Sequence, residues 1–297
     1  MKDKVYAQVY SLIRVNPEGT LNALRQLAAA GYDGVELLGQ RTEGLSEKQF
    51  AAFLKELGLK VISSHNLTTE DDFGFAARLG AKYTDLRPHY RDSSRDEILR
   101  CCEDLNAQGR RRAAAGLRAV VHNHAEEFWW VNDREGGERI YDLMLQNTDP
   151  AYVNFEFDVG WGARAGINPT DYVRQYAGRF PLLHVKECST AAKNRDEMAH
   201  FPKFFTDAIR KDKKDGVQIP GAPKASSEKV MQAMYESRNW NSDLGDGLIN
   251  WVELIAAAEA QGCEGYISER EYYHTRKVPD GDPVKCAAVD CAYMRSW

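Results

Sequence analysis

The sequence has no apolar run long enough to cross a bilayer and no excess of positive charge. A membrane span needs about 18 or more consecutive apolar residues. The opening segment MKDKVYAQVYSLIRV also lacks the long apolar stretch and small-residue cleavage site of a signal peptide. The 297 residues include 39 Lys and Arg against 44 Asp and Glu, a net charge of −5, which disfavours a surface that neutralises phosphate backbones. We therefore expect a cytoplasmic protein that binds neither nucleic acid nor membranes.

Cysteines are few and irregularly spaced. The six cysteines, at positions 101, 102, 188, 263, 286 and 291, form no CxxC pair, so we expect reduced thiols rather than a structural zinc site or a disulfide scaffold. Hydrophobic residues make up 43% of the chain and charged residues 28%, which is typical of a globular protein with a sizeable core.

Strand-like apolar runs alternate with helical stretches eight times along the chain. The runs cover residues 5–10, 34–38, 60–64, 83–87, 118–124, 153–158, 182–187 and 265–269. The stretches between them carry helix signals, such as Ser46 as a cap and Gly31 after a helix end. Eight alternations predict an α/β fold, the parallel (β/α)8 TIM barrel, which runs to about 250 residues as one unit.

We expect a single barrel domain over residues 1–297 with two additions. Residues 189–246, between the seventh and eighth strands, carry the segments RKDKKDG and IPGAP. Long loops in compact domains are usually functional, so we interpret this insertion as a lid or subunit-contact element, with a surface helical hairpin as the alternative. Residues 272–297 predict a helical extension on the outside of the barrel. Such barrels commonly form dimers or tetramers, so a homo-oligomer is one option and the oligomeric state is left open.

Ionisable residues lie at the ends of three late strands: Asp158, His184 and Glu269. The C-terminal ends of barrel strands meet at one rim, and buried ionisable groups are costly without a partner. The three residues therefore predict a site for one divalent metal ion. For a fourth ligand from VVHNHAEEF we favour Glu127, with His122 as the main alternative. Three carboxylates and one imidazole favour Mn²⁺, with Co²⁺, Mg²⁺ or Zn²⁺ as alternatives.

Four segments also carry a resemblance to a known family. They are VVHNHAEEF, NFEFDVGWGARAG, GRFPLLHVKE and LGDGLINWVELIAAAEAQGCEGYISERE. Together they resemble the sugar phosphate isomerase/epimerase family with the xylose isomerase-like barrel, and more narrowly its branch with a His-Asn-His-x-x-Glu-Phe signature. The match covers nearly the whole barrel, from GYDGVELLG onward. In the family, acidic residues and one His at strand ends hold a single divalent ion. The resemblance carries this set over onto Asp158, His184, Glu269 and a residue of 122–127.

The chain departs from the family pattern at Glu187, where a strand-end Asp is usual, and in the length of the insertion. These departures leave the identity of the substrate open. The resemblance implies a small-molecule sugar substrate and an isomerase or epimerase that acts on a keto-sugar or sugar derivative through an enediolate, which the cation stabilises. The candidate acid/base groups are His124 and Glu269, and Lys186 would hold substrate oxygens. The candidates for substrate contacts are Glu36, His65, His122 and Trp161.

Other functions stay open. The same site would catalyse β-elimination or hydration if a leaving group is lost, so a lyase or hydratase acting on a 3-keto-glycoside or inosose is the alternative. A DNA-repair endonuclease shares this barrel, but it needs several zinc ions and more His ligands than the seven His residues here provide. A third hypothesis is a sugar-binding or scaffold protein without enzymatic activity. It predicts no bound metal, or bound metal without exchange of substrate protons. GDGLINW offers only a weak anion-binding signal, which favours an unphosphorylated substrate.

Overall fold

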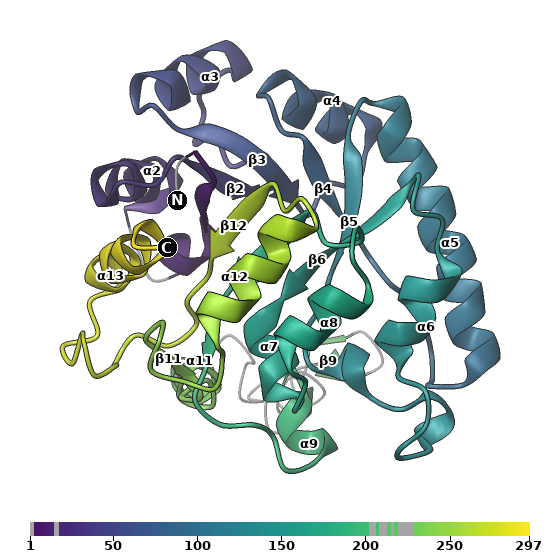
Figure 1. Ribbon diagram of the computed structural model, residues 1–297. Helices are drawn as coiled ribbons and strands as arrows, with labels where there is room; N and C mark the ends of the chain where they lie inside the picture. Colours follow the sequence, from purple (N-terminus) through teal and green to yellow (C-terminus); the bar gives the residue numbers. More distant parts are fainter. Residues whose placement is uncertain (1–2, 15–17, 202–205, 208–212, 215–216, 219–227) are drawn as a thin grey trace.

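Eight parallel strands close into a barrel in the computed structural model, which describes residues 3–14, 18–201, 206–207, 213–214, 217–218 and 228–297 (Figure 1). The barrel strands are β1 (Val5–Gln8), β2 (Gly34–Leu38), β3 (Lys60–His65), β4 (Tyr83–Leu86), β5 (Arg118–His122), β6 (Val153–Asp158), β7 (Leu182–Val185) and β12 (Gly265–Ser268). They are neighbours in chain order, and β12 pairs with both β7 and β1. The predicted TIM barrel is confirmed.

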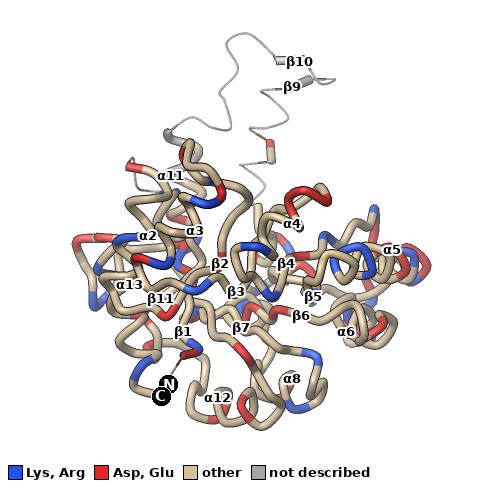
Figure 2. Tube along the Cα trace, turned by 90° about the horizontal axis from the view of Figure 1, so that it is seen from above, with Lys and Arg blue, Asp and Glu red and all other residues tan. Residues whose placement is uncertain are grey.

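Helices surround the barrel (Figure 1). They are α1 (Tyr10–Ile13), α2 (Gly19–Ala30), α3 (Glu47–Glu56), α4 (Glu70–Arg78), α5 (Arg95–Ala114), α6 (Ile140–Asn147), α7 (Val159–Arg164), α8 (Pro169–Gln175), α12 (Trp251–Ala260) and α13 (Pro283–Arg295). Two 3-10 turns, η1 (Glu126–Phe128) and η2 (Val131–Asp133), follow β5. The predicted signals are present: Ser46 forms a capping box with Gln49 at the start of α3, and Gly31 ends α2 with φ of 96°. Lys and Arg are interspersed with Asp and Glu over these helices (Figure 2).

The barrel interior is apolar at its base and polar toward its mouth. Side chains alternate faces along each strand, so one set packs outward under the helices and the other fills the barrel. Six interior side chains form a separate apolar cluster in which each is at most 5% exposed: Tyr6, Ile62, Tyr83, Val120, Leu182 and Ile267. Two residues farther along the same strands, the side chains become polar, as at Gln8, His122, His184 and Glu269. The polar layer lies at the C-terminal end, where barrel enzymes hold their active sites.

The first and last segments of the insertion after β7 lie side by side. Strand β8 (Glu187–Cys188) pairs antiparallel with β11 (Asn241–Ser242). Between them lie α9 (Arg195–Met198), the paired β9 (Lys213–Lys214) and β10 (Val217–Gln218), and α11 (Glu228–Glu236). IPGAP and most of RKDKKDG lie outside the described residues. Because both ends are tied to the barrel mouth, the first part of the insertion lies next to the polar layer.

The C-terminal segment ends in α13, which lies beside α2 on the outside of the barrel (Figure 1). The hydroxyl of Tyr32 donates a hydrogen bond to the Ala287 carbonyl at 2.9 Å, and the Arg270 guanidinium binds the Asp290 carboxylate at 2.8 Å. All six cysteines are buried and free. Within the described ranges, we find no helix with both the length and the apolar character that a membrane crossing requires.

Candidate active site

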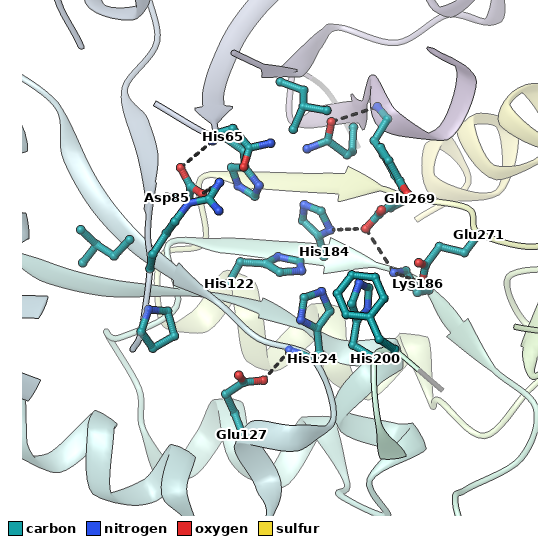
Figure 3. Close-up of a pocket in the computed structure, with 18 of the residues that line it drawn as sticks. His65, Asp85, His122, His124, Glu127, His184, Lys186, His200, Glu269 and Glu271 are labelled. Carbon is teal, nitrogen blue, oxygen red and sulfur yellow. Dashed lines mark hydrogen bonds and ion pairs between the residues drawn. The ribbon is translucent and has the colours of Figure 1, made fainter. Parts of the chain in front are cut away.

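A cavity of about 520 Å³ opens at the C-terminal end of the barrel. It is lined mainly by polar side chains from several strands and from the insertion, shown in Figure 3. Among them are His65, Asp85, His122, His124, Glu127, His184, Lys186, His200, Glu269 and Glu271. This volume is within the range of small-molecule sites, roughly 300 to 1,000 Å³.

Four ionisable residues come together at the floor of this cavity, where His122, His184 and Glu269 line it and Asp158 is fully buried beside them. His122, Asp158, His184 and Glu269 each offer a ligand atom, and these atoms all lie within 4.8 Å of one another. Asp158 and His184 are paired neighbours on β6 and β7, and Glu269 directly follows β12 on the other side of β7. One oxygen of Asp158, Oδ2, is buried and accepts no hydrogen bond; its close contact is an ion pair with the Lys186 ammonium at 3.2 Å. Two imidazoles and two carboxylates fit a divalent ion such as Mn²⁺, Co²⁺ or Zn²⁺.

The structure brings together three of the four predicted metal ligands and separates Glu127 from them. Glu127 lies in η1, past the end of β5, and its carboxylate accepts a hydrogen bond from the His124 backbone N–H at 2.7 Å. Figure 3 shows Glu127 on the far side of His124 from His184 and Glu269. The adjacent Phe128 is fully buried against Tyr141, with ring centroids 4.7 Å apart, which anchors the turn. The alternative fourth ligand, His122, lies in the cluster, whereas Glu127 belongs to a separate group of possible ligands with His124 and Glu126.

Lys186 occupies the centre of the carboxylates on the β12 side. Its ammonium lies 3.2 Å from Asp158 Oδ2, 3.1 Å from Glu269 Oε2 and 2.9 Å from Glu271 Oε2, and the residue is only 1% exposed. Burial alone would lower the pKa of Lys186, but Asp158, Glu269 and Glu271 raise it above its usual value. Burial likewise works against the ionised Glu269, yet Lys186 and His184 hold its pKa below the usual value. The site thus contains a charged lysine surrounded by carboxylates.

A second polar group lies one layer deeper. Glu36, His65, Glu156 and His184 also offer ligand atoms within 4.8 Å of one another. His184 belongs to both groups: its Nδ1 lies 3.2 Å from Glu269 Oε2, and its Nε2 lies 2.8 Å from Glu36 Oε1. Burial and the neighbouring Glu36 raise the pKa of Glu156 to about 7. Glu156 is not among the predicted site residues, although it lies two residues before Asp158 on β6 and its side chain is on the same face of the strand.

Two predicted substrate contacts, Glu36 and Trp161, do not line the cavity. Glu36 is fully buried and does not line the cavity, because it lies two residues before the end of β2 and binds Gln8 Nε2 at 2.6 Å. Trp161 is 1% exposed and also does not line the cavity. It lies in α7, where its ring packs behind His124 at a centroid distance of 5.5 Å. His65 and His122, the other two candidates, do line the cavity.

His124 lines the cavity next to a residue that the sequence analysis missed. The His200 ring, from the insertion, stacks on the His124 ring with centroids 3.9 Å apart. Burial and the neighbouring His200 lower the pKa of His124 below its usual value, and burial lowers the pKa of His200 to about 4. Both imidazoles are therefore held neutral. A lone His in an insertion gives no periodic signal, so only the fold reveals this contact.

Glu187, the departure from the family pattern, is turned away from the cavity. It is fully buried and accepts hydrogen bonds from Trp251 Nε1 at 2.6 Å and from the Gly245 N–H at 3.0 Å. Glu187 therefore joins β8 to the segment that leads into α12.

Comparisons with known proteins agree with this barrel. A family model described as "Xylose isomerase-like TIM barrel" matches residues 24–296. An inosose dehydratase from Clostridium botulinum (strain Alaska E43 / Type E3) is 24% identical over 163 residues, which cover 53% of this chain and 50% of that protein. The chain thus spans about half the length of the curated relatives it matches.

Two solved structures have the same fold. A sugar phosphate isomerase/epimerase from Parabacteroides distasonis ATCC 8503 is similar with a TM-score of 0.68 at 21% identity, covering 100% of this chain and 95% of that chain. The IOLI protein with a binding zinc atom has a TM-score of 0.64 at 13% identity, covering 99% of this chain and 97% of that chain. At these identities the likeness concerns the fold.

Proposed function

The chain belongs to the xylose isomerase-like TIM barrel family, and we propose that it is a metal-dependent enzyme that isomerises or epimerises a keto-sugar or sugar derivative. The observation that carries this proposal is the cluster of His122, Asp158, His184 and Glu269, three of which line the cavity while Asp158 is buried beside them. The zinc atom in the IOLI protein, which has the same fold, is consistent with a metal in such a barrel.

The four cluster residues would hold the ion, and Mn²⁺, Co²⁺ and Zn²⁺ suit their mixture of nitrogen and oxygen donors better than Mg²⁺ does. A divalent ion there would polarise a substrate carbonyl and stabilise the negative charge that forms when the neighbouring carbon loses a proton. The Lys186 ammonium would donate hydrogen bonds to substrate oxygens, because it faces the same cavity.

Two groups on different strands would move the proton. His124 follows β5, and Glu269 follows β12, so they reach the cavity from separate sides of the barrel. One group would take the proton from the carbon, and the other would return a proton to the neighbouring carbon or to the opposite face. Each such group contributes about 10² to 10⁴ in rate.

A lyase or hydratase is the second candidate, and the named relatives favour it. In this reaction the second group would protonate a departing hydroxyl or glycosidic oxygen instead of a carbon. The curated relatives are inosose dehydratases, although each matches only about half of its length. A 3-keto-glycoside or an inosose would be the substrate of this alternative.

One experiment separates these outcomes. The protein, loaded with Mn²⁺ or Zn²⁺, is incubated in D₂O with keto-sugars, keto-glycosides and inososes. Deuterium in the recovered substrate or its isomer would support isomerisation, and an unsaturated product absorbing in the near ultraviolet would support elimination. If no substrate gave deuterium exchange or an unsaturated product, both proposals would be contradicted.

Asp158→Asn is the matched variant. Asp158 caps α7 by accepting a hydrogen bond from the Trp161 N–H at 2.9 Å, and Asn serves as well at such a position. The variant should therefore keep the fold, checked by circular dichroism, and lose bound metal and turnover. Full activity with full metal content in Asp158→Asn would refute the assigned role.

A further inference from the structure

A second cavity of about 430 Å³ adjoins the first. His124, Glu127, His200 and Phe201 line both cavities, so the two compartments share a wall. Three residues of the metal-ligand cluster, His122, His184 and Glu269, line the first compartment, and none of the cluster lines the second. Building on the proposed function, we infer that the second compartment binds a second sugar ring, so that the substrate is an uncharged glycoside rather than a free monosaccharide or a sugar phosphate.

The second compartment combines an apolar wall with a few polar groups. Trp129, Ile140 and Met198 supply the apolar part of the lining. The Trp129 ring is fixed by a hydrogen bond from its Nε1 to Asp133 at 2.7 Å and by the Arg195 guanidinium, 5.0 Å from the ring centroid. A pyranose presents C–H groups on its faces and hydroxyls around its edge, so a rigid aromatic side chain beside polar groups suits it.

One polar group of this compartment, the Glu126 carboxyl, has an oxygen without a hydrogen-bond donor. Glu126 accepts the His200 N–H at 2.6 Å through Oε1, while its Oε2 is buried without a partner. Glu127 lies beside it in the same lining. A buried acceptor without a partner is costly, and a sugar hydroxyl would satisfy it. Burial raises the pKa of Glu126, and burial together with Glu126 raises the pKa of Glu127 to about 7, so this pair offers a phosphate no positive charge.

The positive charges around both compartments are already paired. Among the described residues that line either cavity, every Lys and Arg has a carboxylate within 4 Å. The pairs are Arg87 with Asp85 at 3.6 Å, Arg91 with Glu97 at 3.0 Å, Arg195 with Asp133 at 2.8 Å and Lys186 with Glu271 at 2.9 Å. The lining therefore offers a phosphate no unpaired lysine or arginine, which favours a neutral ligand.

The insertion forms one side of the second compartment. Arg195 and Met198 lie in α9, and His200 and Phe201 follow it. The same insertion contributes the His200 ring that stacks on His124. The long connection after β7 would thus select glycosides by building the site for their second ring.

Binding of unreactive sugars tests this inference without turnover. Isothermal titration calorimetry would compare cellobiose and maltose with glucose and glucose 6-phosphate. We expect at least one disaccharide to bind roughly tenfold more tightly than glucose, and Trp129→Ala to remove most of that difference. Trp130→Ala is the matched control, because the neighbouring Trp130 lines neither cavity, and it should keep the difference. Met198→Phe narrows the same compartment from the side of the insertion and should also weaken disaccharide binding. It replaces Trp129→Ala as the test variant if Trp129→Ala does not fold.

Equal binding of glucose and both disaccharides, or tighter binding of glucose 6-phosphate, would overturn the inference, as would equal effects of the two Trp variants. The failure of the proposed function has a different signature. Disaccharide binding that depends on Trp129, without deuterium exchange or elimination on any keto-derivative, would leave the second sugar site standing and reject the chemistry. Deuterium exchange on keto-monosaccharides with no preference for two-ring ligands would support the chemistry and reject the second sugar site.

Discussion

Replacing Lys186 with methionine tests whether its ammonium neutralises the carboxylates of the site. Lys186 is 1% exposed, and its ammonium lies within 3.2 Å of Asp158, Glu269 and Glu271. Methionine has a similar length and no charge, so Lys186→Met fills the space and leaves the three carboxylates without this partner. Among the described residues, Glu271 keeps Arg238 at 3.7 Å, while Glu269 and Asp158 keep only the His184 imidazole, at 3.2 and 3.9 Å.

Breaking a buried ion pair by removing one partner costs about 3 to 5 kcal/mol, and we expect Lys186→Met to lose that much free energy of unfolding in the presence of a chelator. A divalent ion bound by Asp158 and Glu269 would replace the lost positive charge. Added Mn²⁺ or Zn²⁺ should therefore stabilise the variant more than it stabilises the original protein.

Urea unfolding with EDTA and with saturating metal measures both effects. Lys285→Met is the control, because Lys285 pairs with Asp280 on the surface, where its side chain is 60% exposed, and its loss should change stability little. A loss below about 0.5 kcal/mol for Lys186→Met in EDTA, the range of ordinary surface substitutions, would refute the charge argument. Equal stabilisation of both proteins by metal would show that the ion and the ammonium do not share carboxylates.

Three further predictions concern other contacts. Glu36→Gln should weaken metal binding about 10- to 100-fold in chelator competition, because Glu36 holds the Nε2 side of His184 and such outer partners orient metal ligands; unchanged affinity would contradict this. Ser46→Ala should lower the free energy of unfolding by about 1 kcal/mol through loss of the capping box, and Ser46→Asp should largely retain it. Glu187→Leu should lower the free energy of unfolding by about 1 to 3 kcal/mol, because the buried Trp251 Nε1–H would lose its hydrogen-bond acceptor. A variant as stable as the original protein would rule out this anchoring role.

The barrel could be predicted from the sequence because strand periodicity and helix signals are local. The predicted range 34–38 coincides with β2 and the range 153–158 with β6. The rim position of Asp158 and His184 followed from the same pattern, since parallel neighbours in a closed barrel end at the same rim. These inferences needed only the order of the strands.

The remaining features depend on depth and on long-range contacts. Glu36 is a predicted substrate contact, but two further residues of β2 follow it, so its side chain lies one layer below the cavity. Glu127 was expected to point into the barrel, and a 3-10 turn directs it to the backbone instead. His200 contacts His124, which lies 76 positions earlier in the sequence, through an insertion whose path has no periodic signal. Side-chain depth and insertion contacts are set by packing rather than by local pattern.

The charge balance around His184 connects these features. Four carboxylates, those of Glu36, Glu156, Asp158 and Glu269, are at most 9% exposed and lie within 4 Å of His184. In the described part of the chain, Lys186 is the one Lys or Arg within 4 Å of any of them. Buried charges of one sign are costly unless a cation is close. Accordingly, the pKa of Glu156 is raised to about 7, and against the effect of burial Glu156 and Glu36 raise the pKa of His184 above its usual value. A divalent ion on the Nδ1 side of His184, opposite Glu36, would supply that cation where the two layers meet, which is why metal binding and barrel stability should change together in this protein.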